Sequence, residues 1–209
     1  MIRSFRILAG TVKQYVIIFS ALIGGIAAAG AVNKLVRVDW LNGFLNNAVR
    51  LIASMAMAVF LIVVLLGVYN MNSPEATGYK YYHSLPNSAE LFKDAVIFAN
   101  VGAVVITAAC AVLLAVFFEV GNALFAAAVS LFGVGIMNFL GHLKSLFAKM
   151  LSLVLVGCTG GFSMGFADGA EIEVSLWVYA VIAAVSAAVY IAGTVFAAVR
   201  AKTVWEREA

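Results

Sequence analysis

The chain has 209 residues, of which 65% are hydrophobic and only 11% charged, and its mean hydropathy is +1.07. A soluble domain carries about 25% charged residues, so this chain has too little polar surface to cover a body that faces water on all sides. The net charge is only +3, and the Lys and Arg residues lie beside the predicted membrane spans, where they set the orientation of a membrane protein. No nucleic acid is therefore expected as a partner.

Six runs without charged residues are each long enough to cross a bilayer, because about 20 apolar helical residues span about 30 Å of hydrocarbon. In chain order they are 14–33, 51–70, 95–118, 120–141, 150–167 and 174–199. They do not show the alternation over about 10 residues that is typical of outer-membrane strands. The sequence therefore predicts an all-α, multi-pass membrane protein with six transmembrane helices in a single domain, 1–209.

The residues before the first run carry Arg3, Arg6 and Lys13 among apolar side chains. A basic amphipathic segment of this kind is able to lie along the membrane interface. A simple extension of the first span, with basic residues as anchors, is the other interpretation. The first run is too long for a signal peptide, and Lys34 follows it in place of a small-residue cleavage site, so no cleavable signal peptide is expected.

The basic residues divide unevenly between the two ends of the six predicted spans. One side holds Arg3, Arg6, Lys13, Lys80, Lys93, Lys144, Lys149, Arg200, Lys202 and Arg207. The other side holds Lys34, Arg37 and Arg50. Loops rich in Lys and Arg stay in the cytoplasm, so both termini are predicted to be cytoplasmic.

Residues 71–94 are the one long polar segment of the chain, between the second and third runs. Proline is favoured at the first position of a helix, so Pro86 is expected to start one. Glu90 then lies in the first turn, where the helix dipole favours an anion, and residues 91–97 continue the helix into the third span. The segment therefore predicts a short cytoplasmic helix at the start of that span.

Several ring side chains come just before this predicted helix. They are Tyr79, Tyr81, Tyr82 and His83. Aromatic residues at a membrane boundary are most often interface anchors. Docking of a partner in water is the alternative, and the sequence leaves both open.

This arrangement resembles the permease subunits of ABC-2 type exporters. Those proteins have six spans, both termini inside, and a leucine-proline followed by a polar helix that couples to an ATPase. The matching residues here are Ser84, Leu85, Pro86, Asn87 and Ser88, followed by Leu91 and Phe92. The amphipathic N-terminus and the inner turn 142–149 also fit the layout of the family, whereas Glu90 stands where the family usually has a basic residue.

The resemblance implies a cell (inner) membrane protein that exports a hydrophobic or amphipathic cargo, such as a lipid, peptide or drug. A separate ABC ATPase subunit would hold ATP and Mg, since this chain contains no G-x-x-x-x-G-K-[ST] motif. The chain itself is therefore expected to be neither an enzyme nor a cofactor protein, and a second permease chain would complete a homodimer or heterodimer. The residues expected to contact the ATPase are Tyr82, His83, Leu85, Pro86, Asn87, Glu90, Leu91, Phe92, His142 and Lys144.

Four glycines recur at intervals of four residues in and after the fifth run: Gly157, Gly161, Gly165 and Gly169. On a helix they lie nearly on one face and let another backbone come close. Three roles remain open: packing within one bundle, a contact between subunits, or a break in the helix. The break is plausible because each glycine costs a helix about 1 kcal/mol.

Two other functions remain open. In the first, the chain would be an accessory or structural membrane protein that binds a cytoplasmic partner through residues 71–94. In the second, it would be an ion-coupled carrier. The carrier is disfavoured because no ionisable group other than cysteine or tyrosine lies well inside a predicted span. Metal hydrolysis and serine-esterase chemistry lack their motifs, and Cys110 and Cys158 lie in predicted spans as small core residues.

Overall fold

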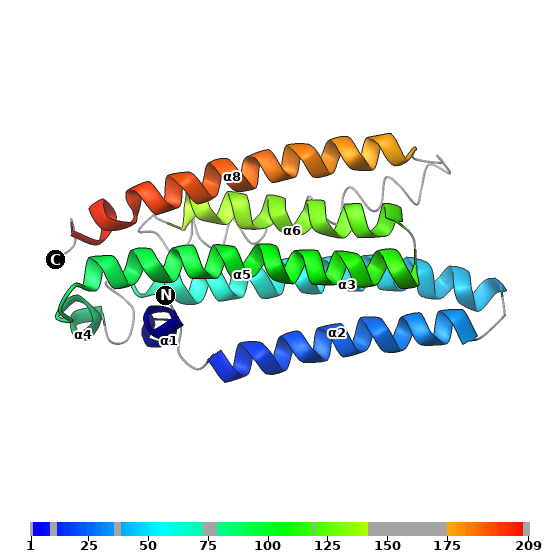
Figure 1. Cartoon of the computed structure of the whole chain (residues 1–209), viewed down its shortest axis with the longest axis horizontal. Coiled ribbons are helices and arrows are strands. Elements are labelled where there is room, and N and C mark those ends of the chain that lie inside the picture. Colours follow the sequence, from blue (N-terminus) through cyan, green and yellow to red (C-terminus); the bar gives the residue numbers. More distant parts are fainter. Residues whose placement is uncertain are drawn as a thin grey trace.

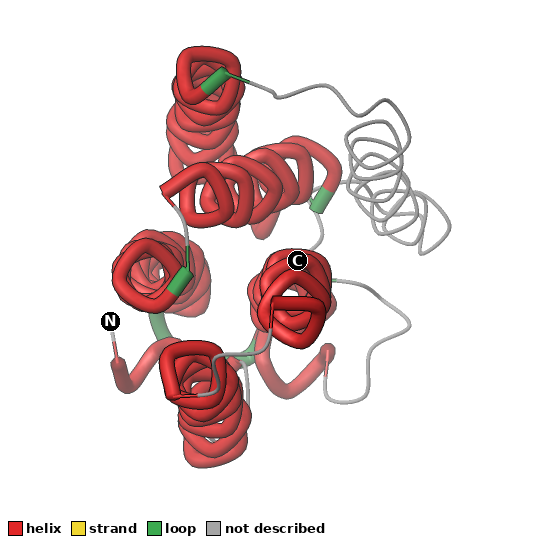
Figure 2. The backbone as a smooth tube through the Cα atoms, turned by 90° about the vertical axis from the view of Figure 1, so that its right-hand side faces the viewer, coloured by secondary structure: helices red, strands yellow, loops and turns green. Residues whose placement is uncertain are grey.

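The computed structural model of the chain describes residues 2–8, 12–35, 39–72, 79–118, 120–141 and 175–206. These residues form helices and no strand, which confirms the predicted all-α class for the described part. The helices are α1 (Ile2–Leu8), α2 (Val12–Leu35), α3 (Asp39–Asn70), α4 (Tyr79–His83), α5 (Ser88–Phe117), α6 (Val120–Leu140) and α8 (Leu176–Glu206). The long helices run side by side as one bundle (Figures 1 and 2).

Four described helices are long and apolar enough to cross a membrane: α2, α5, α6 and α8. α3 has 32 residues, or roughly 48 Å of helix, and residues 56–70 at its end form a shorter apolar stretch. The predicted second span, 51–70, is therefore the last part of a helix that begins at Asp39. The sequence had predicted that the loop between the first two spans continues as far as Arg50. The predicted fifth span, 150–167, lies outside the described residues.

α5 is the central helix, because it packs against α1, α2, α3, α6 and α8. Its buried face carries small side chains at intervals of three or four residues, as a helix with one packed face requires. Ala99, Ala103 and Cys110 belong to this face, and Cys110 is a free thiol. The expectation that Cys110 is a core residue is confirmed, whereas Cys158 lies outside the described residues.

α6 and α8 run in the same direction through the bundle (Figure 1). Near their starts, a Cβ atom on Gly121 would lie 3.3 Å from the ring of Tyr179. Near the end of α6, Asn138 donates a hydrogen bond to Thr194 at 3.2 Å. The end of α6 and the start of α8 therefore lie at opposite ends of the bundle.

Two glycines bring α6 and α8 into direct backbone contact. A Cβ atom on Gly135 would lie 2.9 Å from the backbone nitrogen of Tyr190, and one on Gly193 would overlap the carbonyl oxygen of Gly135. Close approach through small residues is the usual way in which helices associate in membranes. The four glycines predicted to pack, Gly157 to Gly169, lie outside the described residues.

The N-terminal segment is a helix separate from the first span. α1 is seen nearly end-on in Figure 1, whereas the long helices run across the view, so α1 lies across the bundle and does not extend α2. Phe5 is buried against Tyr15 and Phe98, while Arg3 and Arg6 are exposed. The segment is therefore a separate amphipathic helix and not an extension of the first span, and its position along the membrane interface stays a prediction.

Candidate functional site

The polar segment before α5 folds back onto the end of α8. α4 is followed by a turn in which the backbone N–H of Ser84 donates to Lys80 and the Ser84 hydroxyl donates to Tyr81. Asn87 then takes a left-handed conformation (φ 58°, ψ 32°), which asparagine tolerates better than most residues, and α5 begins at Ser88. We call residues 79–92, together with Lys202 and Trp205 of α8, the end cap.

Trp205 is the centre of the end cap. Its ring stacks on His83, with centroids 4.0 Å apart and an interplanar angle of 6°, and on Phe92 at 4.7 Å. Its indole N–H donates a hydrogen bond to the hydroxyl of Ser88 at 2.9 Å. Trp205 is 1% exposed and Phe92 is fully buried. One side chain of α8 thus holds both α4 and the start of α5.

An ion pair adds a second link between the same two helices. Lys202 donates to the carboxylate of Glu90, which lies in the first turn of α5 before the apolar part of that helix. This hydrogen bond is the main reason why the pKa of Glu90 lies below its ordinary value. Both side chains are exposed, and solvent screens an ion pair of this kind, so the packing of Trp205 is the stronger link.

The residues predicted to contact an ATPase fall into three groups. Phe92 is buried beneath Trp205, so a partner would reach it only by displacing that ring. The half-buried residues are Tyr82, His83, Leu85 and Leu91, and the exposed ones are Pro86, Asn87 and Glu90. His142 and Lys144 lie outside the described residues.

The local structure corrects the sequence analysis in two respects. The helix begins at Ser88 and not at Pro86, because Asn87 leaves the right-handed helical region. The short helix α4 was not predicted, since five residues carry no useful periodicity. It makes Tyr81 the most exposed large hydrophobic side chain of the end cap, at 63%. No pattern in the sequence distinguishes which of the neighbouring aromatic residues face outward.

A buried polar network joins four helices near the ends of α3 and α6. Asn138 of α6 accepts a hydrogen bond from Tyr69 of α3 at 2.7 Å and donates to Asn100 of α5 at 2.6 Å. Tyr190 of α8 donates to the carbonyl of Asn100 at 2.9 Å, and the hydroxyl of Thr194 donates to the Asn100 side chain at 3.2 Å. The sequence did not single out Asn100.

The network consists of amides and hydroxyl groups, which bind neighbouring helices rather than perform acid–base chemistry. Among the described residues, no group of three His, Cys, Asp or Glu side chains is placed to hold a metal ion. Comparisons of this chain with models of protein families, with curated proteins and with solved structures found no match.

Proposed function

We propose that this chain is the membrane-spanning permease subunit of an ABC exporter, and that the end cap receives movement from a separate ATPase subunit. The observation that carries the proposal is the position of Trp205, which joins the end cap to α8 while the end cap continues directly into α5. A displacement of α4 would therefore be passed to two long helices at once.

The topology of the described helices supports six crossings. α6 and α8 run in the same direction, and the predicted fifth span, 150–167, lies between them in the sequence. One crossing there, with α2, α3, α5, α6 and α8, gives six and leaves both termini on one side. That side carries most of the Lys and Arg residues, so we place it in the cytoplasm of the cell (inner) membrane.

The exposed part of the end cap is the surface that we assign to the ATPase. Tyr81, Pro86 and Asn87 are all exposed there. Exposed tyrosines are frequent energetic centres of interfaces, because they bury a large ring at small entropic cost. In this proposal ATP and Mg belong to the partner, a second permease chain completes the pathway, and the cargo is hydrophobic or amphipathic.

A second candidate function is an accessory or structural membrane protein that binds a different cytoplasmic partner through the same surface. The dense interior favours it, because Asn100 and Asn138 bond four helices together and Gly135 lets α6 and α8 touch. A bundle fixed in this way suits a static scaffold. The identity of the partner separates the two candidates.

The test is purification of the tagged chain from its native membrane, with mass spectrometry of the proteins that accompany it. The variant Tyr81→Ala removes the exposed ring of the end cap, and Trp177→Ala is the matched control, because Trp177 is 80% exposed at the far end of the bundle. We expect a P-loop ATPase to accompany the wild type and Trp177→Ala. Its amount should fall about tenfold in Tyr81→Ala, the effect of losing about 1.4 kcal/mol at an interface.

Two outcomes contradict the exporter proposal. A stoichiometric partner without a nucleotide-binding domain, lost in Tyr81→Ala, would favour the accessory role. An ATPase that stays bound equally well to Tyr81→Ala and to the wild type would show that the end cap is not its docking surface.

A further inference from the structure

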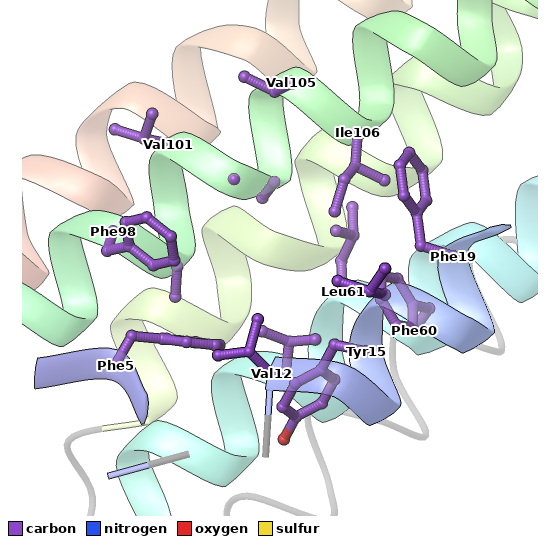
Figure 3. A pocket seen from close by; sticks show the side chains of 15 residues that line it. Phe5, Val12, Tyr15, Phe19, Phe60, Leu61, Phe98, Val101, Val105 and Ile106 are labelled. Carbon is purple, nitrogen blue, oxygen red and sulfur yellow. The ribbon is translucent and has the colours of Figure 1, made fainter. Parts of the chain in front are cut away.

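A cavity of about 310 Å³ lies between α1, α2, α3 and α5 (Figure 3). Four phenylalanines, Phe5, Phe19, Phe60 and Phe98, are among its lining residues. Phe5 and Phe98 lie at the end near α1, whereas Phe19 lies farther along, beside Ile106 (Figure 3). Tyr15 is the one lining residue with a polar side chain, and its hydroxyl lies against Gly67 of α3. The cavity therefore offers its occupant a hydrocarbon surface.

The length of the cavity is close to the depth of one membrane leaflet. Its lining residues on α5 run from Phe98 to Ile106, which is about 12 Å along a helix. One leaflet of hydrocarbon is about 15 Å deep, half of the bilayer core. Phe5 of α1 lies at one end of the cavity. This end is expected at the membrane interface, where an amphipathic helix such as α1 lies.

Basic residues flank, in sequence, the lining residues of the cavity beside α1, and we call them the basic rim. Arg3, Arg6 and Lys13 are all exposed, and they are near neighbours in sequence of the lining residues Phe5 and Val12. No Asp or Glu occurs before Asp39. The start of α5 adds Glu90, Lys93 and Asp94. Glu90 pairs with Lys202 of α8, and the charges of Lys93 and Asp94 cancel.

We propose that this cavity binds an acyl chain of an anionic phospholipid, with the phosphate headgroup held by the basic rim. The apolar wall matches hydrocarbon, the depth matches a single leaflet, and the three cations match a negatively charged headgroup. A volume near 300 Å³ is at the lower end of the range for small-molecule pockets, which suits one chain. The site rests on the membrane location of the protein and does not require transport activity.

The test uses the full chain reconstituted in vesicles that contain a trace of phosphatidylglycerol with a photoreactive diazirine on its acyl chain. Labelled peptides are then mapped by mass spectrometry. The variant Gly102→Leu fills the cavity, because a Cβ atom on Gly102 meets nothing within 4 Å. Gly24→Leu is the matched control, since Gly24 also meets nothing within 4 Å but does not line the cavity.

We expect label on the cavity walls in the wild type and in Gly24→Leu, and its loss in Gly102→Leu. The double variant Arg3→Gln/Arg6→Gln alters only exposed side chains and should lower the label from phosphatidylglycerol to the level given by a phosphatidylcholine probe. Cavity label that persists in Gly102→Leu would overturn the site. Equal labelling of the wild type by both lipids would show bulk lipid and overturn the assignment of an anionic ligand.

Discussion

Replacement of Trp205 by alanine should release the end cap while leaving the rest of the bundle folded. The substitution removes a ring that is 1% exposed and that stacks on both His83 and Phe92. Truncation of a buried Trp to Ala costs about 3–5 kcal/mol. The hydrogen bond to Ser88 is lost as well, which is included in that total.

The assay is hydrogen exchange of the backbone amides of residues 79–92 in the reconstituted protein. Local opening sets the exchange rate of such a segment, and 3 kcal/mol corresponds to roughly a 10²-fold change in an equilibrium constant. We therefore expect exchange in the end cap of Trp205→Ala to be roughly 10²-fold faster, with little change in the middle of α5 and α6. Wild-type exchange rates in that variant would refute the central role of Trp205.

Two further variants separate stacking from hydrogen bonding. Trp205→Phe keeps a ring between His83 and Phe92 but loses the N–H donor, which is worth about 1 kcal/mol, so exchange should rise about fivefold to tenfold. Trp177→Ala removes an exposed indole at the other end of the bundle and should leave the end cap unchanged. If Trp205→Phe behaved like Trp205→Ala, the stacking would not be the main source of stability.

Two other predictions concern the ion pair and the helix contact. The hydrogen bond from Lys202 lowers the pKa of Glu90 in the folded protein, so the stabilisation is complete above the unfolded pKa of about 4.3 and is lost as the pH falls through the folded value. The melting temperature of Glu90→Gln should therefore lie below that of the wild type at pH 7 and match it in acid; a constant difference at all pH values would contradict this. Gly193→Leu places a side chain against the α6 backbone and should lower the free energy of unfolding by about 1–3 kcal/mol. Gly24→Leu should not lower it. Equal melting temperatures for the two variants would disprove the close contact.

The sequence was sufficient for the features that depend on composition and length. The apolar runs at 120–141 and 95–118 correspond closely to α6 and to the membrane part of α5, because a helix in lipid must satisfy its own backbone and so follows the apolar run. The separate helix α1 was also within reach, since Arg3 and Arg6 among apolar residues form a pattern that needs no tertiary information.

The end cap was harder to predict because its arrangement is decided by contacts between residues far apart in the chain. Trp205 lies 117 positions from Ser88 and appears in the sequence as one more aromatic residue near a membrane boundary. Phe92, which is expected to contact the ATPase, lies buried against the Trp205 ring, and no local pattern in the sequence indicates this contact. The regular spacing of glycines predicted close packing around Gly161. The contact of Gly135 with α8 depends on how the two helices are placed, and no local sequence pattern indicates it.

A chain of contacts connects the end cap to the buried network. Trp205 stacks on Phe92, the Phe92 ring meets Tyr69 edge-on at 6.3 Å, and the Tyr69 hydroxyl donates to Asn138. Spatial continuity alone does not establish coupling, so the decisive quantity is an interaction energy.

We expect a double-mutant cycle of Trp205→Ala and Asn138→Ala to be non-additive by at least about 0.5 kcal/mol, the threshold that separates coupled from independent sites. The measurement is the free energy of unfolding of the two single variants, the double variant and the wild type under one condition. A second cycle of Trp205→Ala with Gly24→Leu provides the control, because Gly24 contacts none of these residues. Strict additivity in both cycles would mean that the end cap moves independently of the four-helix network, and the exporter proposal would then lack a route by which α4 acts on the interior of the bundle.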